Sequence, residues 1–278
     1  MAVTLTYVDA AGTSYQLNSS GRTLRALRGE GIPDIVHQVV RTPNRDGETL
    51  IRSLYEPRFL TALVTLAAAD WSALQTARVA MAAALNPRAG IGEIRYQPVA
   101  AGTTYTIPAI LESFGRDVPG SKLERVPLVF RCPDPAWRVS PINSEELLTG
   151  GSGITVPITV PIDILAGAPY PITNAGHLDS PPVFTITGGV TNPLVRNATS
   201  DKTFQLDVTI AVGQTAVIDM GARTAVRSDG LNLMPYRTSE SQMWSLVPGV
   251  NSIEVGFFSA PATPVSFEIE WYTRLAGV

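Results

Sequence analysis

One stretch of sequence divides the chain into two parts, Phe130-Arg131-Cys132-Pro133-Asp134-Pro135-Ala136-Trp137. It follows residues 123–130, whose alternating apolar side chains are typical of a strand. Proline fixes φ at about −65° and has no amide donor, so Pro133 and Pro135 end this strand and set the direction in which the chain leaves it. Trp137 is large enough to pack as a wedge against the domain that precedes it. We therefore expect a first domain over residues 1–140.

Upstream of this stretch the sequence predicts mainly strands. Apolar alternation over residues 3–8, followed by turn residues at 9–14, indicates a hairpin. The turn cluster Thr42–Gly47 (TPNRDG) follows another predicted strand. The further strands expected in this half are 32–41, 58–66, 92–96, 103–112 and 123–130.

A single helix interrupts these strands. Asp70 is a suitable N-cap, because its carboxylate can accept a hydrogen bond from a free backbone amide of the first turn. Asn86-Pro87 ends the helix, since proline disfavours helix in the residue before it. Between them, spacings of three and four residues form one apolar stripe, made of Trp71, Leu74, Ala77, Met81 and Leu85. One helix in a strand-rich half predicts a barrel or sandwich with one covering helix.

The second half is expected to be a β-sandwich. Thr149–Gly153 (TGGSG) is the most linker-like stretch of the chain, so we expect a linker at 141–153 and a second domain at 154–278. Pro157 and Pro161 favour an edge strand or an extended arm over a central strand. Short alternating strands, separated by turns about every 8–12 residues, then indicate a sandwich of the jelly-roll kind.

The composition excludes several classes of protein. With 1 Cys and 2 His among 278 residues, a disulfide framework, a cysteine zinc site and a His-rich metal site are not expected. The chain has no apolar run of 18 residues, so we expect no membrane span. Its first residues, MAVTLTYVDAAG, lack the basic and apolar segments of a signal peptide.

The charge differs between the two halves. Residues 1–140 hold 14 Arg and 1 Lys against 12 acidic residues, a net charge of +3, whereas residues 141–278 hold 5 Arg and 1 Lys against 12, a net charge of −6. This difference supports two domains and is compatible with charge-complementary contacts between neighbouring copies. No arginine run is interleaved with aromatic residues, so the sequence does not indicate a nucleic-acid surface.

The residues that could carry catalysis are few and scattered. Carboxylates for glycoside hydrolysis could come from Asp219, Asp229, Glu268 and Glu270, but no spacing argument joins them. Glu145-Glu146 is read as solvated linker charge, Cys132 as a buried structural thiol, and His37 as a core or interface residue. The sequence therefore predicts no catalytic, cofactor-binding or metal-binding residues and no enzyme.

Several motifs together resemble the phage distal tail protein (Dit) family of long non-contractile, siphophage-type tails. The junction FRCPDPAW resembles the end of that family's N-terminal domain. The second half has the family's order of motifs, YPITNAG at 170–176, PPVFTITG at 181–188, NPLVRN at 192–197, VID at 217–219 and LVPGVN at 246–251. The turn at 42–47 resembles another family turn. The order of the motifs carries the resemblance.

The resemblance implies a structural virion protein at the phage tail tip, made in the bacterial host cytoplasm. In that family the N-terminal domain forms a hexameric ring that extends the tail tube, and the C-terminal domain is a galectin-like sandwich. Implied partners are other copies of the chain, the tail tube protein, a tail-tip or tail-associated protein and the tape-measure protein, with DNA only as passing cargo. The alternative is a carbohydrate-binding adhesion module, for which the aromatic platforms would be Trp244, Trp271 and Tyr236.

Overall fold

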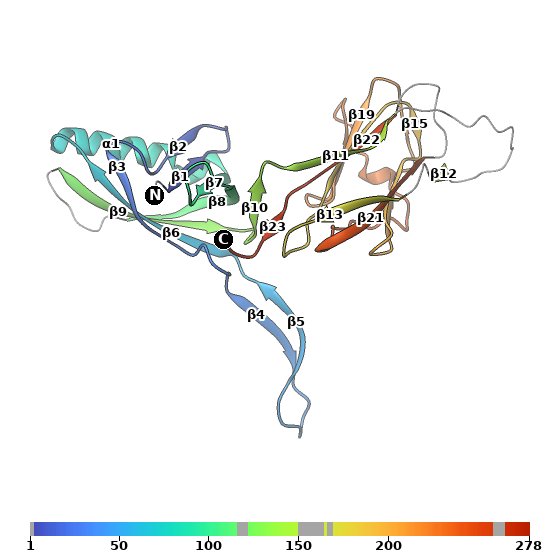
Figure 1. Cartoon of the computed structure of the whole chain (residues 1–278), viewed down its shortest axis with the longest axis horizontal. Coiled ribbons are helices and arrows are strands. Elements are labelled where there is room, and N and C mark those ends of the chain that lie inside the picture. The colour runs from blue at the N-terminus through green and yellow to red at the C-terminus, as the bar shows by residue number, and fades with distance from the viewer. Residues whose placement is uncertain (1–2, 116–121, 150–163, 166–168, 258–264) are drawn as a thin grey trace. The chain divides into compact units, whose positions relative to one another are not determined.

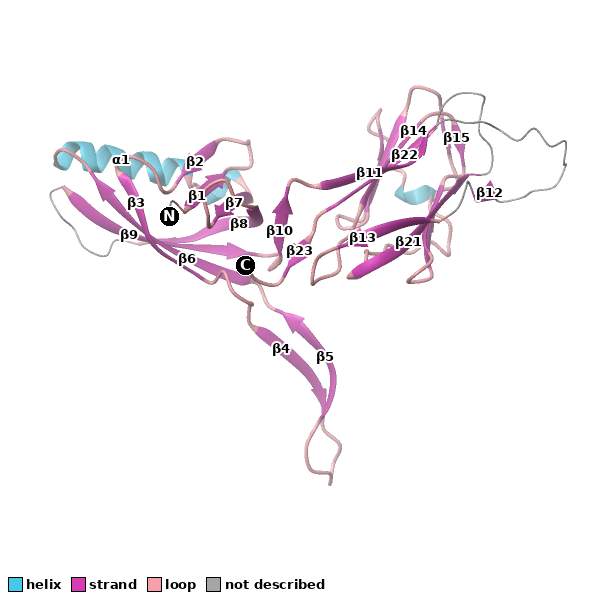
Figure 2. Cartoon of the chain, in the orientation of Figure 1, coloured by secondary structure: helices cyan, strands magenta, loops and turns pink. Residues whose placement is uncertain are grey.

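The structure, a computed structural model, describes residues 3–115, 122–149, 164–165, 169–257 and 265–278. It consists of two compact units, the first made of Met1–Ser140 with Leu275–Val278 and the second of Pro141–Arg274. Almost all regular elements of the described residues are strands, and one α-helix, α1 (Trp71–Ala84), lies in the first unit (Figures 1 and 2). The mainly β fold expected from the sequence is confirmed.

The first unit is built on one long antiparallel sheet. Its path has two ends, so the sheet is open, and β10 (Trp137–Ser140) pairs with β8 beside it. A 3-10 turn (Pro87–Ala89) follows α1. In order across the sheet, the strands are β2 (Ser14–Gln16), β1 (Thr4–Val8), β7 (Gly92–Gln97), β8 (Thr104–Phe114), β9 (Leu123–Cys132), β6 (Arg58–Ala67) and β3 (Arg22–Arg28).

Helix α1 covers one face of this sheet (Figure 1). Asp70 caps it as expected, because its Oδ1 accepts a hydrogen bond of 2.8 Å from the amide of Ala73. Leu74, Met81 and Leu85 are fully buried in the core of the unit. Trp71 is 47% exposed, so its place on the buried stripe was wrongly predicted: as the first helical residue it lies at the end of the covered surface.

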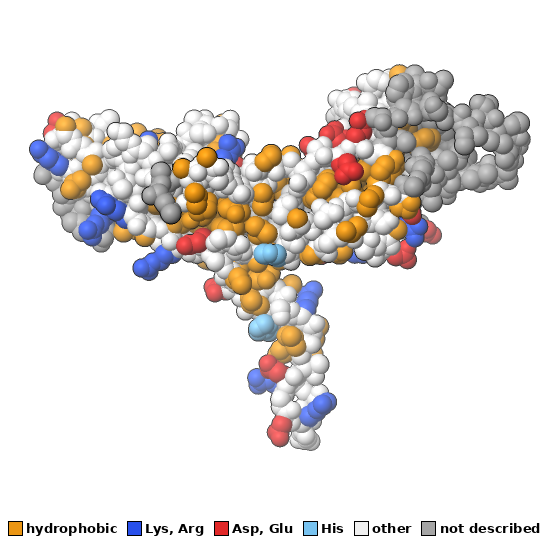
Figure 3. Space-filling view, viewed as in Figure 1, with side chains coloured by type: hydrophobic (Ala, Val, Ile, Leu, Met, Phe, Trp, Pro, Cys, Tyr) orange, Lys and Arg blue, Asp and Glu red, His pale blue; other side chains and the backbone are white. Residues whose placement is uncertain are grey.

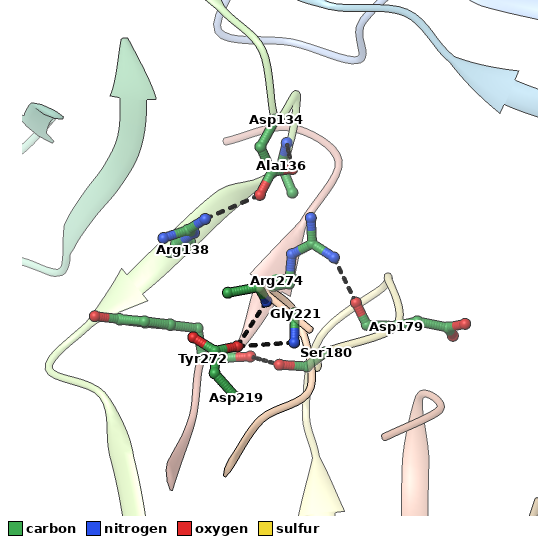
Figure 4. Close-up of polar contacts among 10 residues, drawn as sticks. Asp134, Ala136, Arg138, Asp179, Ser180, Asp219, Gly221, Tyr272 and Arg274 are labelled. Carbon is green, nitrogen blue, oxygen red and sulfur yellow. Dashed lines mark hydrogen bonds and ion pairs between the residues drawn. The ribbon is translucent and has the colours of Figure 1, made fainter. Parts of the chain in front are cut away.

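The junction motif fixes the end of the sheet. Trp137 is fully buried in the core of the first unit, and its indole Nε1 donates a 3.1 Å hydrogen bond to the carbonyl of Glu30. The predicted wedge is therefore confirmed. Asp134 stabilises the turn that leads into Trp137. Its carboxylate accepts hydrogen bonds from the amide of Ala136 at 3.2 Å and from Arg138 at 3.0 Å (Figure 4).

A hairpin leaves the sheet of the first unit. It consists of β4 (Ile35–Val40) and β5 (Thr49–Tyr55), which pair only with each other, and it extends away from the sheet (Figures 1 and 2). The predicted turn cluster lies at its tip. Sequence reasoning missed β5, and it also missed β3, the strand at one end of the sheet.

The second unit is a sandwich of two sheets, as expected. Phe184 and Ile269 of one sheet and Val195 and Ile253 of the other lie in one buried core. The first sheet is β11 (Asn143–Thr149), β22 (Ser266–Trp271), β14 (Val183–Thr187), β19 (Thr215–Asp219) and β20 (Thr224–Arg227). The second is β12 (Ile164–Leu165), β21 (Gly249–Phe257), β16 (Leu194–Asn197) and β17 (Lys202–Gln205), with β13 (Tyr170–Asn174) also on β21. The remaining short elements are β15 (Val190–Thr191), β18 (Thr209–Ile210) and a 3-10 turn (Met234–Tyr236). The last strand, β23 (Arg274–Leu275), pairs with β10 in the sheet that β10 shares with β8.

Two expectations about the domain boundaries were wrong. Residues 143–149 of the predicted linker form β11, which pairs with β22, and Asn143 Nδ2 donates to the carbonyl of Trp271 at 3.1 Å. Glu145-Glu146 consequently lies in a strand and is not linker charge. At the other end, Leu275–Val278 belongs to the first unit instead of the second. Residues 150–153 of the predicted linker, and residues 154–163 of the edge strand or arm predicted over 154–165, lie outside the described residues.

Candidate assembly interface

The hairpin β4–β5 exposes apolar side chains along its length (Figure 3). Leu50 is 56% exposed and Ile51 is 62% exposed, values ordinary for charged side chains and unusual for a run of aliphatic ones. The exposed apolar residues of the hairpin are Ile35, Val36, Val40, Leu50, Ile51, Leu54 and Tyr55. Exposed apolar side chains gathered on one hairpin are typical of an interaction site.

These residues lie on both faces of the hairpin. Successive side chains of a strand point to opposite faces. One face carries the cross-strand pair Ile35 and Tyr55, and the other carries the pair Val36 and Leu54. A hairpin that packed on one surface would need only one apolar face. A partner that covered one face alone would leave the apolar pair of the other face exposed.

A polar pair lies within each face. His37 Nδ1 and Ser53 Oγ are 2.8 Å apart on one, and Arg52 Nε donates to Gln38 Oε1 at 2.6 Å on the other. Each contact pairs one donor with one acceptor inside the hairpin, so covering these atoms removes less hydrogen bonding to water than covering unpaired atoms would. The sequence predicted that His37 lies in a core or an interface. His37 is exposed, so the prediction of a core position was wrong.

Arg58 holds the root of the hairpin. It is 3% exposed and follows β5 by three residues. Its guanidinium donates to the carbonyls of Gly29 at 2.6 Å, Gly31 at 2.5 Å and Pro135 at 3.0 Å, and also to that of Ala276. Burial lowers the pKa of Arg58, while the nearby Cys132 and Glu30 act to raise it. The buried charge is therefore compensated mainly by backbone dipoles.

The loop before β4 receives hydrogen bonds on three consecutive carbonyls. Arg58 binds the carbonyls of Gly29 and Gly31. The carbonyl of Glu30, which lies between them in the chain, accepts hydrogen bonds from Trp137 Nε1 and, at 3.1 Å, from the amide of Val278. Gly29 has φ +93°, and a Cβ atom there would lie 2.1 Å from the carbonyl oxygen of Phe59. Only glycine fits this approach. The junction and the C-terminal residues thus both hold the hairpin root.

The candidate catalytic carboxylates have structural contacts. Asp219 Oδ1 accepts from the amides of Gly221 and Ala222, both at 2.8 Å, and so closes a turn (Figure 4). Glu268 accepts from Ser144 Oγ at 2.6 Å. Asp229 pairs with Arg227 at 2.7 Å, and this hydrogen bond lowers the pKa of Asp229 to about 2. Among the described residues, no three His, Cys, Asp or Glu side chains are grouped so that they could hold a metal ion.

Cys132 is a buried structural thiol, as the sequence predicted. It is fully buried, and burial raises its pKa to about 12. At neutral pH almost none of it is the reactive thiolate.

The sugar-binding alternative loses two of its three aromatic platforms. Trp244 is 3% exposed and packs edge-on against Phe184, with 5.4 Å between ring centroids, and Trp271 is 7% exposed. Only Tyr236 is exposed. Stacking on a sugar ring requires an open aromatic face, which the two tryptophans do not offer.

The asparagines of the family-like motifs fasten loops in the second unit. Asn174 donates from Nδ2 to the carbonyls of Leu178 and Leu246, both at 3.0 Å. Asn251 donates to the carbonyls of Val247 at 2.8 Å and Gly249 at 3.1 Å. Asn197 accepts at Oδ1 from the amide of Thr199 at 3.0 Å and from that of Ser200 at 3.3 Å. All three are buried, so these asparagines hold the geometry of their loops.

In the part of the chain that the structure describes, no helix has the length and apolar character needed to cross a membrane.

Comparison with known proteins agrees with this architecture. Residues 175–274 match the family described as Siphovirus-type tail component, C-terminal domain. The crystal structure of SPP1 Dit (gp 19.1), described as a paradigm of hub adsorption apparatus in Gram-positive infecting phages, has a TM-score of 0.72 at 16% identity and covers 99% of both chains. A chain of the phage P2 baseplate in its activated conformation with Ca has a TM-score of 0.57 at 9% identity, covering 97% of this chain and 98% of that chain. A search of curated proteins gave no match.

The family match covers most of the second unit, and the likeness in fold extends over both units. The motif order noted in the sequence therefore corresponds to a shared architecture, with a galectin-like sandwich after a helix-covered sheet. The chain carries the C-terminal domain of the siphovirus-type tail components and has, over its whole length, the fold of a phage distal tail protein, which confirms the resemblance to that family.

Proposed function

We propose that this chain is a structural hub of a phage tail tip, in which the first unit of each copy joins its neighbours in a ring of six. The observation that carries the ring is the hairpin β4–β5, with apolar side chains exposed on both faces. The fold of a distal tail protein supports the location in the virion, after synthesis in the host cytoplasm. SPP1 Dit, which shares this fold, is described as a hub.

The geometry of the hairpin favours a ring over a two-fold dimer. A hairpin that is enclosed by a neighbour needs an acceptor surface different from itself. Contacts between two different surfaces are head-to-tail, and such contacts close into rings when the rotation between neighbours permits. An isolated two-stranded hairpin is at best marginally stable in water, so enclosure also stabilises it.

The ring would join the tail tube protein on one side and a tail-tip or tail-associated protein on the other, with the tape-measure protein and DNA passing through it. These partners follow from the likeness to tail hubs. The role requires no catalytic, cofactor-binding or metal-binding residues. We expect no turnover of cell-wall or capsule glycans in dye-release assays, and turnover that Glu268→Gln abolishes would contradict a purely structural role.

Light scattering on the full chain tests the ring. We expect a species of six times the 29.7 kDa chain mass, appearing as the protein concentration rises. The double substitution Leu50→Ser with Leu54→Ser removes one apolar side chain from each face of the hairpin and should leave a monomer. Association that persists in this variant would show that the hairpin is not the contact.

The matched control replaces two exposed valines of the second unit. Val212 is 60% exposed and Val250 is 63% exposed, so Val212→Ser with Val250→Ser removes a similar apolar surface elsewhere. This variant should associate like the unmodified chain. If both double variants weaken association equally, the loss reflects general hydrophobicity and not the hairpin.

A further inference from the structure

The sheet of the first unit has one face covered by α1 and one exposed face. On β6, Leu60, Ala62, Val64 and Leu66 are fully buried beneath the helix. The alternate residues of β3, β6 and β9 point to the opposite face. We call this surface the open face; it is made of the outward side chains of these three strands, all of which the structure describes.

Four arginines lie on the open face. Arg25 and Arg28 come from β3, Arg125 and Arg131 come from β9, and all four are exposed. The three strands contain one acidic residue, Glu124. Its side chain is fully buried and lies 3.6 Å from Arg78 of α1, so it faces the helix. The open face of β3, β6 and β9 therefore carries positive charge and no negative side chain.

Two of the arginines flank one threonine. Arg125 is directly opposite Thr65 in the pairing of β9 with β6, and Arg25 Nε donates to Thr65 Oγ1 at 3.2 Å. An open depression of about 730 Å³ lies at this place. It is lined by Arg25, Leu63, Thr65, Leu123, Glu124 and Arg125. The hydrogen-bonded Arg25 and Thr65 thus lie beside a depression that Arg125 also lines, and that is wide enough for an oxyanion.

The second pair of arginines lies farther along the same strands. Arg131 is six residues beyond Arg125, which corresponds to about 20 Å at a rise of about 3.3 Å per residue. Arg28 of β3 lies opposite Thr61 of β6, and Thr61 lies opposite Val129 of β9, which is two residues from Arg131. The ligand of the whole face must therefore present negative charge at points about 20 Å apart.

We propose that the open face binds the phosphate backbone of duplex DNA without regard to sequence. Arginine guanidinium groups form forked hydrogen bonds with phosphate oxygens. A length of about 20 Å spans about six base pairs, so both arginine pairs can meet phosphates of one duplex. Phe59 is the one aromatic residue on the face of these strands, which does not supply the series of stacking platforms typical of single-strand binding.

This proposal goes beyond a hub through which DNA passes, because it assigns the contacting residues. Binding is tested on the full chain with a fluorescein-labelled 30-base-pair duplex of random sequence at about 50 mM salt, where phosphate contacts are strong. Arg25→Glu with Arg125→Glu should weaken binding by about tenfold or more. The slope of log affinity against log salt concentration should also become less steep, by the amount expected for the loss of about two phosphate contacts.

The matched control reverses two exposed arginines outside the open face. Arg88 in the 3-10 turn after α1 and Arg237 directly after the 3-10 turn of the second unit are both exposed, and Arg88→Glu with Arg237→Glu changes the net charge by the same amount. This control should retain binding. Equal loss in both variants would overturn the proposal, since the effect would then follow net charge.

Poly-glutamate separates nucleic acid from an acidic protein partner. The proposal expects the duplex to displace labelled poly-glutamate. It is overturned if poly-glutamate binds the open face and the duplex does not, or if neither binds at low salt. Circular dichroism of each variant checks that the fold is kept.

Discussion

The hairpin β4–β5 and the strand β14 both contain several large apolar residues, but their surroundings are opposite. In β14, alternation places Phe184 and Ile186 in the core of the second unit and the residues between them nearer the surface. In β5 every side chain is exposed, although Leu50, Ile51 and Leu54 are as apolar as the residues of β14. The difference lies in what faces the strand, since β14 has a second sheet opposite it and β5 has none. The apolar residues of β14 therefore stabilise the chain's own fold, whereas those of β5 are left exposed to solvent, as the proposed ring contact requires.

The largest expected effect comes from emptying the core of the sandwich. Phe184 is fully buried and contacts Trp244, so Phe184→Ala should lower the free energy of unfolding by about 3–5 kcal/mol. Chemical unfolding followed by tryptophan fluorescence measures this loss. Val217→Ala, an exposed position on the adjacent strand β19, serves as the control and should change it by less than about 0.5 kcal/mol. Comparable losses in the two variants would break the contrast between buried and exposed apolar residues.

The second effect concerns the root of the hairpin. Arg58→Met keeps much of the side-chain volume but removes four hydrogen bonds to backbone carbonyls, and should cost about 3 kcal/mol. Cys132 pairs with Arg58 across β6 and β9 and is the one cysteine of the chain, so its reaction with a thiol reagent at pH 8 reports opening of the root.

The direction in which the reaction rate of Cys132 changes separates an electrostatic effect from opening of the hairpin root. The charge of Arg58 lowers the pKa of Cys132, while burial, the larger cause, raises it to about 12. Removing the charge alone would raise the pKa further and slow the reaction. Faster reaction in Arg58→Met therefore means that the thiol has become accessible. Unchanged or slower reaction would show that the root stays closed without Arg58. Arg52→Met, on the exposed part of the hairpin, should leave the rate unchanged.

The sequence predicted those features that depend on neighbouring residues. The helix was readable from Asp70, the spacing of its buried residues and Asn86-Pro87. The wedge at Trp137 was readable because two prolines fix the chain just before it. The buried asparagines were visible as motifs, although their role in fastening loops needed the structure.

The features that sequence reasoning missed depend on distant residues. Alternation of apolar residues predicts that a strand has an apolar face, but it does not predict whether another element covers that face. The exposure of the hairpin could therefore not be predicted from the sequence. The four arginines of the open face come from β3 and β9, which are joined only through β6. The strand β11 resembled a linker because the pairing that makes it a strand lies with β22, more than 110 residues later in the chain.

A smaller effect is expected at a fastened loop. Asn251→Ala leaves the carbonyls of Val247 and Gly249 and the amide of Val247 without their side-chain partner, which should cost about 2 kcal/mol. Hydrogen exchange of residues 245–251 should rise, while that of the hairpin should not. Asn18→Ala, which removes a side-chain contact to the carbonyl of Val3 in the first unit, is the comparison. Faster exchange at 245–251 in that variant as well would mean that the loop does not depend on Asn251.

The smallest effect on stability is expected where the apolar side chain is most exposed. Ile51 is 62% exposed and lies at the irregularity where the pairing of β5 with β4 shifts register. In a dilute sample where the chain is a monomer, Ile51→Ala should change the free energy of unfolding by less than about 0.5 kcal/mol, because little apolar area is removed from water in the monomer. At higher concentration the same substitution should weaken association, since an enclosed isoleucine loses its contacts. A measurable loss of stability in the monomer would show that Ile51 already packs against its own chain. If association is fully retained, Ile51 does not take part in the contact between copies. Only the combination of a stable monomer and weaker assembly fits a hairpin whose apolar residues are reserved for a neighbour.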